Sequence, residues 1–361
     1  MQTVRSWPYS VAVVVSVLVG AAAVAGTSSL GIPLKDPEGF LGPAYVRLPL
    51  LALVLFGIGL VFAGLRRRGV RQLWLGMGEV VRHEWSLRRL AYVGTGLVTF
   101  YVCYVAYRNL KSVLPVHREG VLYDHQLHAV DQWFLGGSDP AVVLHSVLGV
   151  DWTAGLLSFV YLLYLPLVPV SLMAVLVLSR DVAVGAWYAT ALSLNWVLGT
   201  LSYYVLPALG PVYARPSLYA GLPRTEVADL QQALLSNRVE FLADPLTSDA
   251  IQGVAAFASL HVSVTFALAL FLHRTSPARY LRLAAWTFFG LTFVATLYFG
   301  WHYVLDNLAG VLVGYLAVVI GARATGQHRR ARRSQRTWWR AAISFSSALS
   351  SPGCGRKTAS R

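Results

Sequence analysis

Charged residues are scarce in this sequence of 361 residues, of which only 13% are Asp, Glu, Lys or Arg. Soluble domains carry roughly 25% charged residues, whereas this chain is 56% hydrophobic, with a mean hydropathy of +0.56. Cysteine is almost absent, because only Cys103 and Cys354 occur, and two such distant thiols exclude a disulfide framework. No repeat of fixed period is visible, and no polar stretch is long enough for a separate soluble domain. The composition therefore predicts an all-α, polytopic integral membrane protein.

Eight apolar runs have the length of about 17 to 25 residues that a helix needs to cross a hydrocarbon core of ~30 Å. They are Pro8–Ser28, Leu48–Leu65, Leu90–Tyr107, Ala154–Leu178, Ala183–Leu206, Val254–Leu272, Leu283–Phe299 and Val304–Ala322. The first run is also compatible with a signal peptide, since Arg5 precedes it and small residues end it, but it is long for one. None of the runs shows the paired interruptions that are typical of transporters.

The order of apolar and basic segments predicts four parts. Residues 1–65 form an accessory hairpin of two transmembrane helices, and residues 66–89 form a basic cytoplasmic connector. Residues 90–322 form a core of six helices. Residues 323–361 form a basic tail rich in Arg and Ser, which we expect to be disordered.

Lys and Arg are distributed unevenly between the two sides of the predicted bundle. With a cytoplasmic N-terminus, 22 of the 30 Lys and Arg residues fall on the cytoplasmic side. Because cytoplasmic loops carry an excess of Lys and Arg, both termini are predicted to be cytoplasmic. The net charge of +14 then faces the anionic lipids of the inner leaflet. The run His328–Arg333 is also compatible with nucleic-acid binding, but the membrane accounts for it better and no nucleic-acid partner is expected.

Two predicted outer loops, residues 108–153 and 207–253, are long. The first contains a stretch with an apolar helical face, which indicates a helix lying on the membrane surface. Its apolar residues are Tyr123, Leu127, Val130 and Phe134, and its polar side carries Asp124, His125, His128 and Asp131. Pro140 after Asp139 marks the start of a further helix. In the second loop, four prolines between Pro207 and Pro223 predict a non-helical first half.

Two short motifs stand at the outer ends of apolar runs, about forty residues apart. One is Ser259-Leu260-His261 and the other is His302-Tyr303-Val304-Leu305-Asp306. Ionisable side chains beside lipid are costly, so such residues are candidates for a functional site. His302 and Asp306 are four residues apart and share a helical face, so the carboxylate can orient the imidazole. With His261, the set supplies a nucleophile and a separate general acid.

The surroundings of these motifs indicate an anionic ligand. Helix N-termini at Ser259 and His302 present unpaired N–H groups, and Arg215 adds a guanidinium suited to phosphate. Ser259 is expected either to bind phosphate or to cap its helix. Four aromatic residues are assigned to the membrane interface, with contact to substrate as the alternative: Tyr203, Tyr204, Tyr213 and Trp301.

These residues resemble the signatures of the type 2 phosphatidic acid phosphatase superfamily, whose members have a core of six helices. Arg215-Pro216 resembles the first signature, Ser259-x-His261 the second, and His302-x-x-x-Asp306 the third. The His-Tyr pair and Gly310 are similar to the branch of fungal inositol phosphorylceramide synthases and their actinobacterial relatives. The resemblance covers residues from about Leu90 to Ala322.

Four positions depart from the superfamily pattern. In the second signature, usually Pro-Ser-Gly-His, Ala258 replaces Pro and Leu260 replaces Gly. Ala208 stands where the first signature has Lys, and Thr296 where the third has Arg. Two of the three usual phosphate-binding cations are thus missing. Since the synthase branch lacks the same Lys and Arg, the resemblance favours a transferase over a simple phosphatase.

The resemblance implies a membrane enzyme that acts on a lipid-linked phosphate at the extracytoplasmic face. His302 is expected to form a phosphohistidine, Asp306 to orient His302, and His261 to act as general acid and base. Transfer of a phosphoryl group or phospho-headgroup is preferred, as in inositolphosphotransferases. Hydrolysis of phosphatidate or of a polyprenyl (di)phosphate is the alternative. No metal or cofactor is needed for this chemistry.

Two alternatives of other classes use the same residues. His261 and His302 are suitable axial ligands for haem in a redox protein, although Asp306 would then have no role. His261, His302 and Asp306 together are also of the types that bind zinc. The sequence leaves open the donor lipid, the acceptor, the oligomeric state and the role of the first two helices.

Overall fold

The structure is a computed structural model that describes residues 7–37, 43–179 and 181–328. Within these ranges it contains thirteen α-helices, two short 3-10 helices and no strand. The helices are α1 (Ser10–Ser28), α2 (Ala44–Arg68), η1 (Val70–Gln72), α3 (Leu73–Glu84), α4 (Leu87–His117), α5 (Asp124–Phe134), α6 (Pro140–Leu148), α7 (Trp152–Leu178), α8 (Val182–Val205), α9 (Pro211–Ala214), η2 (Pro216–Tyr219), α10 (Glu226–Ala243), α11 (Leu260–Thr275), α12 (Arg279–Tyr298) and α13 (Val304–Ala324). Arg5 and the tail beyond His328 lie outside the described residues.

Seven helices in the described residues are long and apolar enough to cross a membrane, namely α1, α2, α4, α7, α8, α12 and α13. The remaining predicted run, Val254–Leu272, contains most of α11, which is apolar but only 16 residues long. At 1.5 Å per residue it extends over about 24 Å. The prediction of a polytopic helical membrane protein is confirmed.

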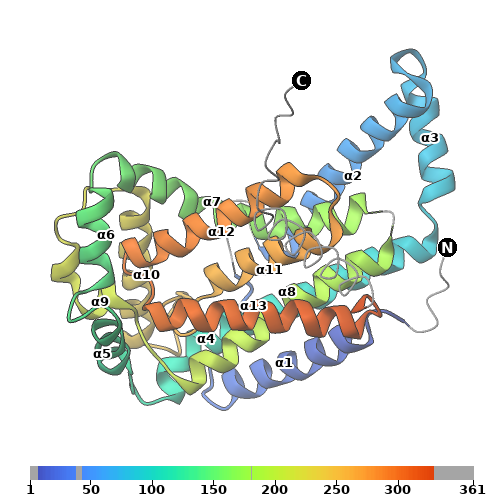
Figure 1. Cartoon of the computed structure of the whole chain (residues 1–361). Coiled ribbons are helices and arrows are strands. Elements are labelled where there is room, and N and C mark those ends of the chain that lie inside the picture. Colours follow the sequence, from blue (N-terminus) through green and yellow to red (C-terminus); the bar gives the residue numbers. More distant parts are fainter. Residues whose placement is uncertain (1–6, 38–42, 180, 329–361) are drawn as a thin grey trace, which may run out of the picture.

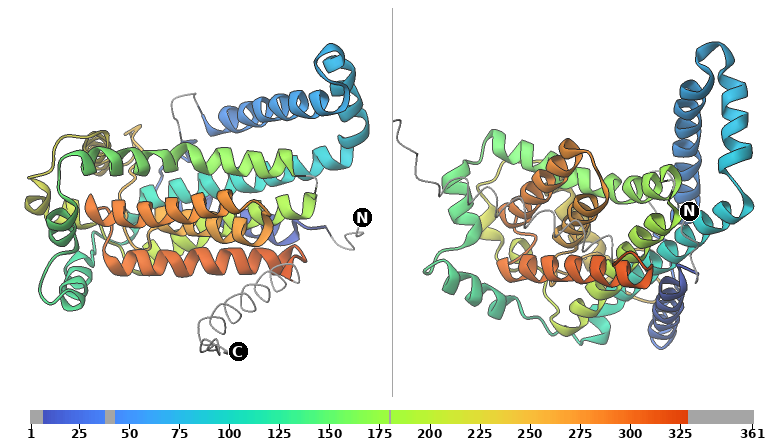
Figure 2. Two further views of the ribbon diagram at one scale, coloured as in Figure 1. Left: turned by 45° about the horizontal axis from the view of Figure 1, so that its top comes forward. Right: turned by 45° about the vertical axis from the view of Figure 1, so that its right-hand side comes forward.

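Helix α8 lies at the centre of the bundle and packs against α1, α4, α7, α11 and α13. All of its residues from Ala183 to Trp196 are buried, whereas Leu201 and Val205 near its end are exposed. Helices α5, α6, α9 and α10 gather at one end of the bundle, and the α2–α3 hairpin extends at the other end (Figures 1 and 2). The two ends of the protein are therefore built differently, and the site described below lies toward the end with α5 and α6.

Close packing between α11 and α13 brings the two sequence motifs together. A Cβ atom at Gly310 would lie 2.4 Å from the Ser259 carbonyl oxygen, and one at Gly314 would lie 2.4 Å from that of Ser263. Only glycine permits this approach, as in the small-residue helix contacts of other membrane proteins. The Ser259 amide also donates to the Asp306 carbonyl at 2.9 Å. The start of α11 is thus fixed against the first turn of α13.

The first two helices do not pair with each other as the predicted hairpin of residues 1–65 requires. Helix α1 packs mainly on α4, and its Tyr9 and Ala12 belong to the main apolar core. Helix α2 packs instead on α3 and α7. The predicted connector of residues 66–89 therefore contains a helix, α3, which forms the hairpin with α2.

Helix α4 is longer than predicted. The apolar run ends at Tyr107, but the helix continues to His117. Asn109 and Lys111 in this extension are buried against other parts of the protein. Arg108 ends the apolar run in the sequence, but the helix continues beyond it.

The long loops contain more helix than predicted. The prolines of residues 207–223 do not keep this stretch entirely non-helical, because Pro211 and Pro216 each start a single helical turn, a position that proline favours. The prediction of a helix beginning at Pro140 is confirmed by α6, whose N-cap is Asp139.

Candidate active site

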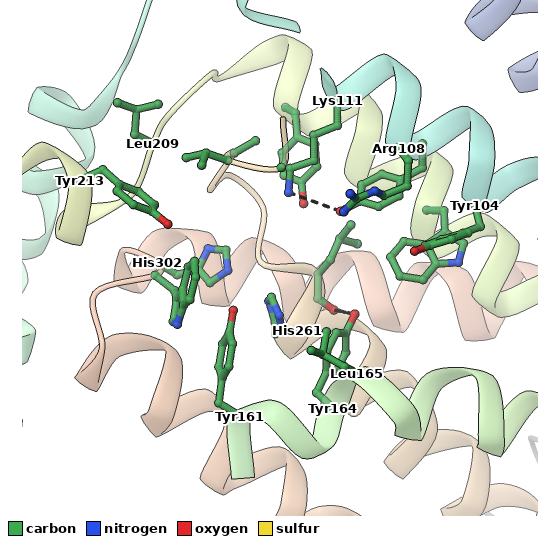
Figure 3. Close-up of a pocket in the computed structure, with 18 residues that line it drawn as sticks. Tyr104, Arg108, Lys111, Tyr161, Tyr164, Leu165, Leu209, Tyr213, His261 and His302 are labelled. Carbon is green, nitrogen blue, oxygen red and sulfur yellow. Dashed lines mark hydrogen bonds between the residues drawn. The ribbon is translucent and has the colours of Figure 1, made fainter. Parts of the chain in front are cut away.

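A partly open cavity of about 150 Å³ lies among α4, α7, α8, the start of α11 with the loop before it, and the loop before α13. The residues around it are drawn in Figure 3. His261 and His302 both line it, and their ring centroids are 5.9 Å apart. The two motifs that lie about forty residues apart in the sequence therefore face the same space.

His302 is held in the short segment between α12 and α13. Its Nδ1 lies 3.4 Å from Oδ2 of Asp306 but forms no hydrogen bond with it. The same carboxylate oxygen accepts the Tyr303 amide at 2.9 Å, so Asp306 also caps α13. Burial, with a smaller contribution from the Lys111 ammonium, lowers the pKa of His302 to about 3. The ring is therefore neutral at pH 7, as a nucleophile must be.

His261 is the second residue of α11. Ser259 caps this helix, since its hydroxyl accepts the Val262 amide at 3.4 Å. Ser259 is fully buried and does not line the cavity, whereas His261 is partly accessible from it. Ser259 is thus placed to orient the start of α11, the capping role that its position also predicted.

Two cations of α4 line the cavity, and the sequence analysis did not identify either of them. Arg108 and Lys111 share one face of α4 with Tyr104 and Tyr107. The Lys111 ammonium lies 4.9 Å from the ring centroid of Tyr203 and donates to the Tyr107 hydroxyl at 3.4 Å. In the sequence these four residues have the spacing i, i+3, i+4, i+7, which is typical of one helical face and could have indicated that they lie together.

No carboxylate among the described residues forms an ion pair with Arg108 or Lys111. Lys111 is only 8% exposed. A buried ammonium without a counter-charge is strongly unfavourable, and buried charges in proteins are normally paired. The cavity is therefore electrostatically complementary to an anion.

The other predicted site residues are divided between the cavity and its surroundings. Tyr203, Tyr213 and Trp301 line the cavity. Tyr204 does not, and its hydroxyl donates to the Leu110 carbonyl at 2.9 Å. Arg215 is exposed and lies outside the lining, and its contact with phosphate stays a prediction.

Helix α5 faces the protein with most of the side that was predicted to be polar. His125 is exposed, but Asp124, His128 and Asp131 are buried, while Trp133 on the other side is 78% exposed. Amphipathicity alone does not show whether a polar face meets water or polar groups of the protein.

The buried carboxylates of α5 hold the loops around the cavity. Asp124 accepts the amides of Leu209 and Gly210 and the Tyr303 hydroxyl, at 2.9 to 3.1 Å. Asp131 accepts the Val304 amide at 3.0 Å, at the start of α13. Burial raises the pKa of Asp131 to about 7, although this hydrogen bond opposes the shift. Helix α5 thus connects the loop before α9 to the His302 segment.

The geometry favours neither the zinc site nor the haem-binding site. Among the described residues, no three His, Cys, Asp or Glu side chains are grouped so that they could hold a metal ion. The His261 ring stacks on Tyr161 at 4.6 Å and contacts Tyr164 at 4.4 Å. These two rings and the other aromatic side chains of the lining leave a cavity of about 150 Å³, which is small for a haem macrocycle.

Comparison with known proteins agrees with the geometry. No curated protein and no solved structure matches the chain. Residues 125–320 match the family model described as the PAP2 superfamily, the phosphatidic acid phosphatase type 2 group. The match covers more than half of the sequence and includes α11, α13 and both histidines that face the cavity. The chain therefore belongs to the PAP2 superfamily, whose activities are of the phosphatase and phosphotransferase type on phosphate-bearing, typically lipid, substrates.

Proposed function

We propose that the protein is a lipid phosphotransferase that works through a phosphohistidine at His302. The observation that carries this proposal is a cavity in which His261 and His302 lie 5.9 Å apart beside an unpaired ammonium. A neutral imidazole, a second imidazole and a site for an anion are the components of phosphoryl transfer by covalent catalysis.

The reaction has two steps that use the same residues. The neutral ring of His302 attacks phosphorus, the bond from phosphorus to the donor lipid's oxygen breaks, and His261 gives its proton to that oxygen. His261 then removes a proton from the acceptor hydroxyl, whose oxygen attacks phosphorus and releases His302. Asp306 orients His302 and balances its positive charge in the intermediate. No metal is required for either step.

Arg108 and Lys111 are proposed to bind the phosphoryl oxygens. They replace the signature cations that are missing at Ala208 and Thr296, although they come from a different helix. The N-terminus of α11 adds N–H groups and a partial positive charge near His261. Catalysis of phosphoryl transfer must stabilise the negative charge on the equatorial oxygens of the phosphoryl group.

Transfer is favoured over hydrolysis for two reasons. The missing signature Lys and Arg resemble the inositol phosphorylceramide synthase branch, which transfers a phospho-headgroup to an alcohol. Aromatic side chains also line much of the cavity, namely Tyr104, Tyr107, Tyr161, Tyr164, Trp196, Tyr203, Tyr213 and Trp301, and such a lining limits the access of water. Phosphatase action on phosphatidate or a polyprenyl (di)phosphate is the second candidate, because the same intermediate can be released by water.

A transfer assay distinguishes these two candidates. Purified full-length protein in mixed micelles is given phosphatidylinositol or a polyprenyl diphosphate, with and without an added alcohol. We expect the phosphorylated alcohol to form faster than free phosphate or free inositol phosphate. Release to water alone, at the same rate with and without the alcohol, would contradict the transferase proposal and favour the phosphatase.

Lys111→Met is expected to stabilise the ligand-free protein and to weaken anion binding. The substitution removes a buried charge whose desolvation costs several kcal/mol. A lost hydrogen bond to a charged group is worth about 1.5–3 kcal/mol, so the inhibition constant for vanadate should rise roughly 10- to 100-fold. Vanadate inhibition and thermal unfolding measure the two effects.

Lys35→Met is the control, because the Lys35 ammonium lies outside the cavity, near Asp249. Unchanged vanadate inhibition in Lys111→Met would contradict the proposal that Lys111 binds the anion.

We also propose that the cavity lies on the extracytoplasmic side, with both termini in the cytoplasm. The placement of 22 of the 30 Lys and Arg residues supports this orientation. Reporter fusions after Arg71 should read cytoplasmic, and a fusion after Arg224 should read extracytoplasmic. A cytoplasmic signal from the Arg224 fusion would reverse the orientation.

A further inference from the structure

Tyr161 of α7 has a place in the cavity that the mechanism above does not use. Its side chain is only 2% exposed, and it lines the cavity with His261 and His302. In Figure 3 its hydroxyl points into the space beside the two imidazole rings.

The ring of Tyr161 is held on both faces. On one side it stacks on His261, with centroids 4.6 Å apart and planes at 28°. On the other side it stacks on Trp301, at 5.1 Å and 2°. Trp301 directly precedes His302, so the Tyr161 ring lies between the two segments that carry the histidines. Such stacking leaves the hydroxyl little freedom to point elsewhere.

The hydroxyl of Tyr161 forms no hydrogen bond with any residue that the structure describes. The hydroxyl of Tyr164, one turn farther along α7, donates to the Leu260 carbonyl at 3.4 Å. Buried tyrosine hydroxyls usually find a partner. The partner of Tyr161 is thus expected to come from a ligand in the cavity.

We propose that Tyr161 is a catalytic residue whose hydroxyl donates a hydrogen bond to an oxygen of the phosphoryl group during transfer. This inference rests on the proposed function, since it needs a phosphoryl group between His261 and His302. The hydroxyl keeps its proton throughout. Its hydrogen bond strengthens as negative charge develops on the oxygen, so it contributes more in the transition state than in the bound substrate.

Tyr161→Phe and Tyr204→Phe form a matched pair of tests, because both remove a tyrosine hydroxyl and only Tyr161 lines the cavity. Loss of a preorganised donor to developing charge lowers kcat by roughly 10²–10³. We expect Tyr161→Phe to lower kcat about 100-fold with little change in KM, and Tyr204→Phe to change kcat by less than about threefold. Steady-state kinetics in mixed micelles and thermal unfolding of each full-length variant measure both effects.

Three results would overturn the inference. They are a Tyr161→Phe kcat close to that of the wild type, an equal loss in both variants, and a loss that appears only in KM. Measuring phosphoenzyme formation in the wild-type protein and in Tyr161→Phe distinguishes a failure of this inference from a failure of the proposed function. If a phosphoenzyme forms at His302 but Tyr161→Phe keeps its rate of formation, only the role of Tyr161 is wrong. If no phosphoenzyme forms in the wild type, the proposed function itself is wrong.

Discussion

His302→Ala is expected to abolish both turnover and the covalent phosphoenzyme. His302 is the only group in the proposed mechanism that bonds to phosphorus, and His261, the other imidazole in the cavity, serves as the acid and base. Loss of a catalytic nucleophile typically lowers kcat by roughly 10⁴-fold or more. Transfer kinetics and labelling with a radioactive phosphate donor measure the two losses.

His125→Ala is the control for this substitution. His125 is an exposed histidine of α5 that does not line the cavity. Its replacement should leave activity close to that of the wild type. Substantial activity in His302→Ala would mean that the nucleophile is another residue or that a water molecule attacks phosphorus directly.

His261→Ala is expected to slow turnover by roughly 10² to 10⁴, the ordinary contribution of a general acid or base. Donors with good leaving groups do not need protonation, so the first step should survive with an activated aryl phosphate. The second step still needs a base to activate the acceptor. The phosphoenzyme should therefore accumulate in His261→Ala, although it is short-lived in the wild type.

Rapid quenching under alkaline conditions, which preserve phosphohistidine, measures this accumulation. The double variant His261→Ala/His302→Ala is the control and should carry no label. If His261→Ala loses activity but gives no phosphoenzyme with the activated donor, the division of roles between the two histidines is wrong.

The His302–Asp306 pair shows what local spacing can predict. The sequence predicts that the two side chains share a helical face. In the structure His302 precedes α13, and the Asp306 carboxylate lies near it because it folds back to cap the start of that helix. The meeting of His261 with His302 depends on the packing of α11 against α13. Gly310 permits that packing, but a single glycine in a sequence does not identify its partner helix.

Arg108 and Lys111 show why the cations of the site were missed. A hydropathy count treats a charged residue as the end of a membrane span, so the predicted span stopped at Tyr107. The helix in fact continues through both residues because they face the cavity inside the protein. Arg215 was chosen from a signature motif, and its motif does not fix the direction of an exposed side chain.

Helix α5 was predicted as an element but not as a support for the site. The apolar pattern identified a helix, and α5 is present at Asp124–Phe134. The hydrogen bonds that the Tyr303 hydroxyl donates to Asp124 and the Val304 amide donates to Asp131 join residues more than 170 positions apart. Contacts of this range follow from the topology of the whole bundle and have no local signature in the sequence.

The proposed mechanism requires that phosphate becomes bonded to His302. Tandem mass spectrometry of peptides from His261→Ala protein, after reaction with the activated donor and alkaline quenching, measures this directly. We expect a phosphohistidine at residue 302 and at no other residue. Phosphate on another side chain, or a fully active enzyme that carries no phosphate, would contradict the mechanism.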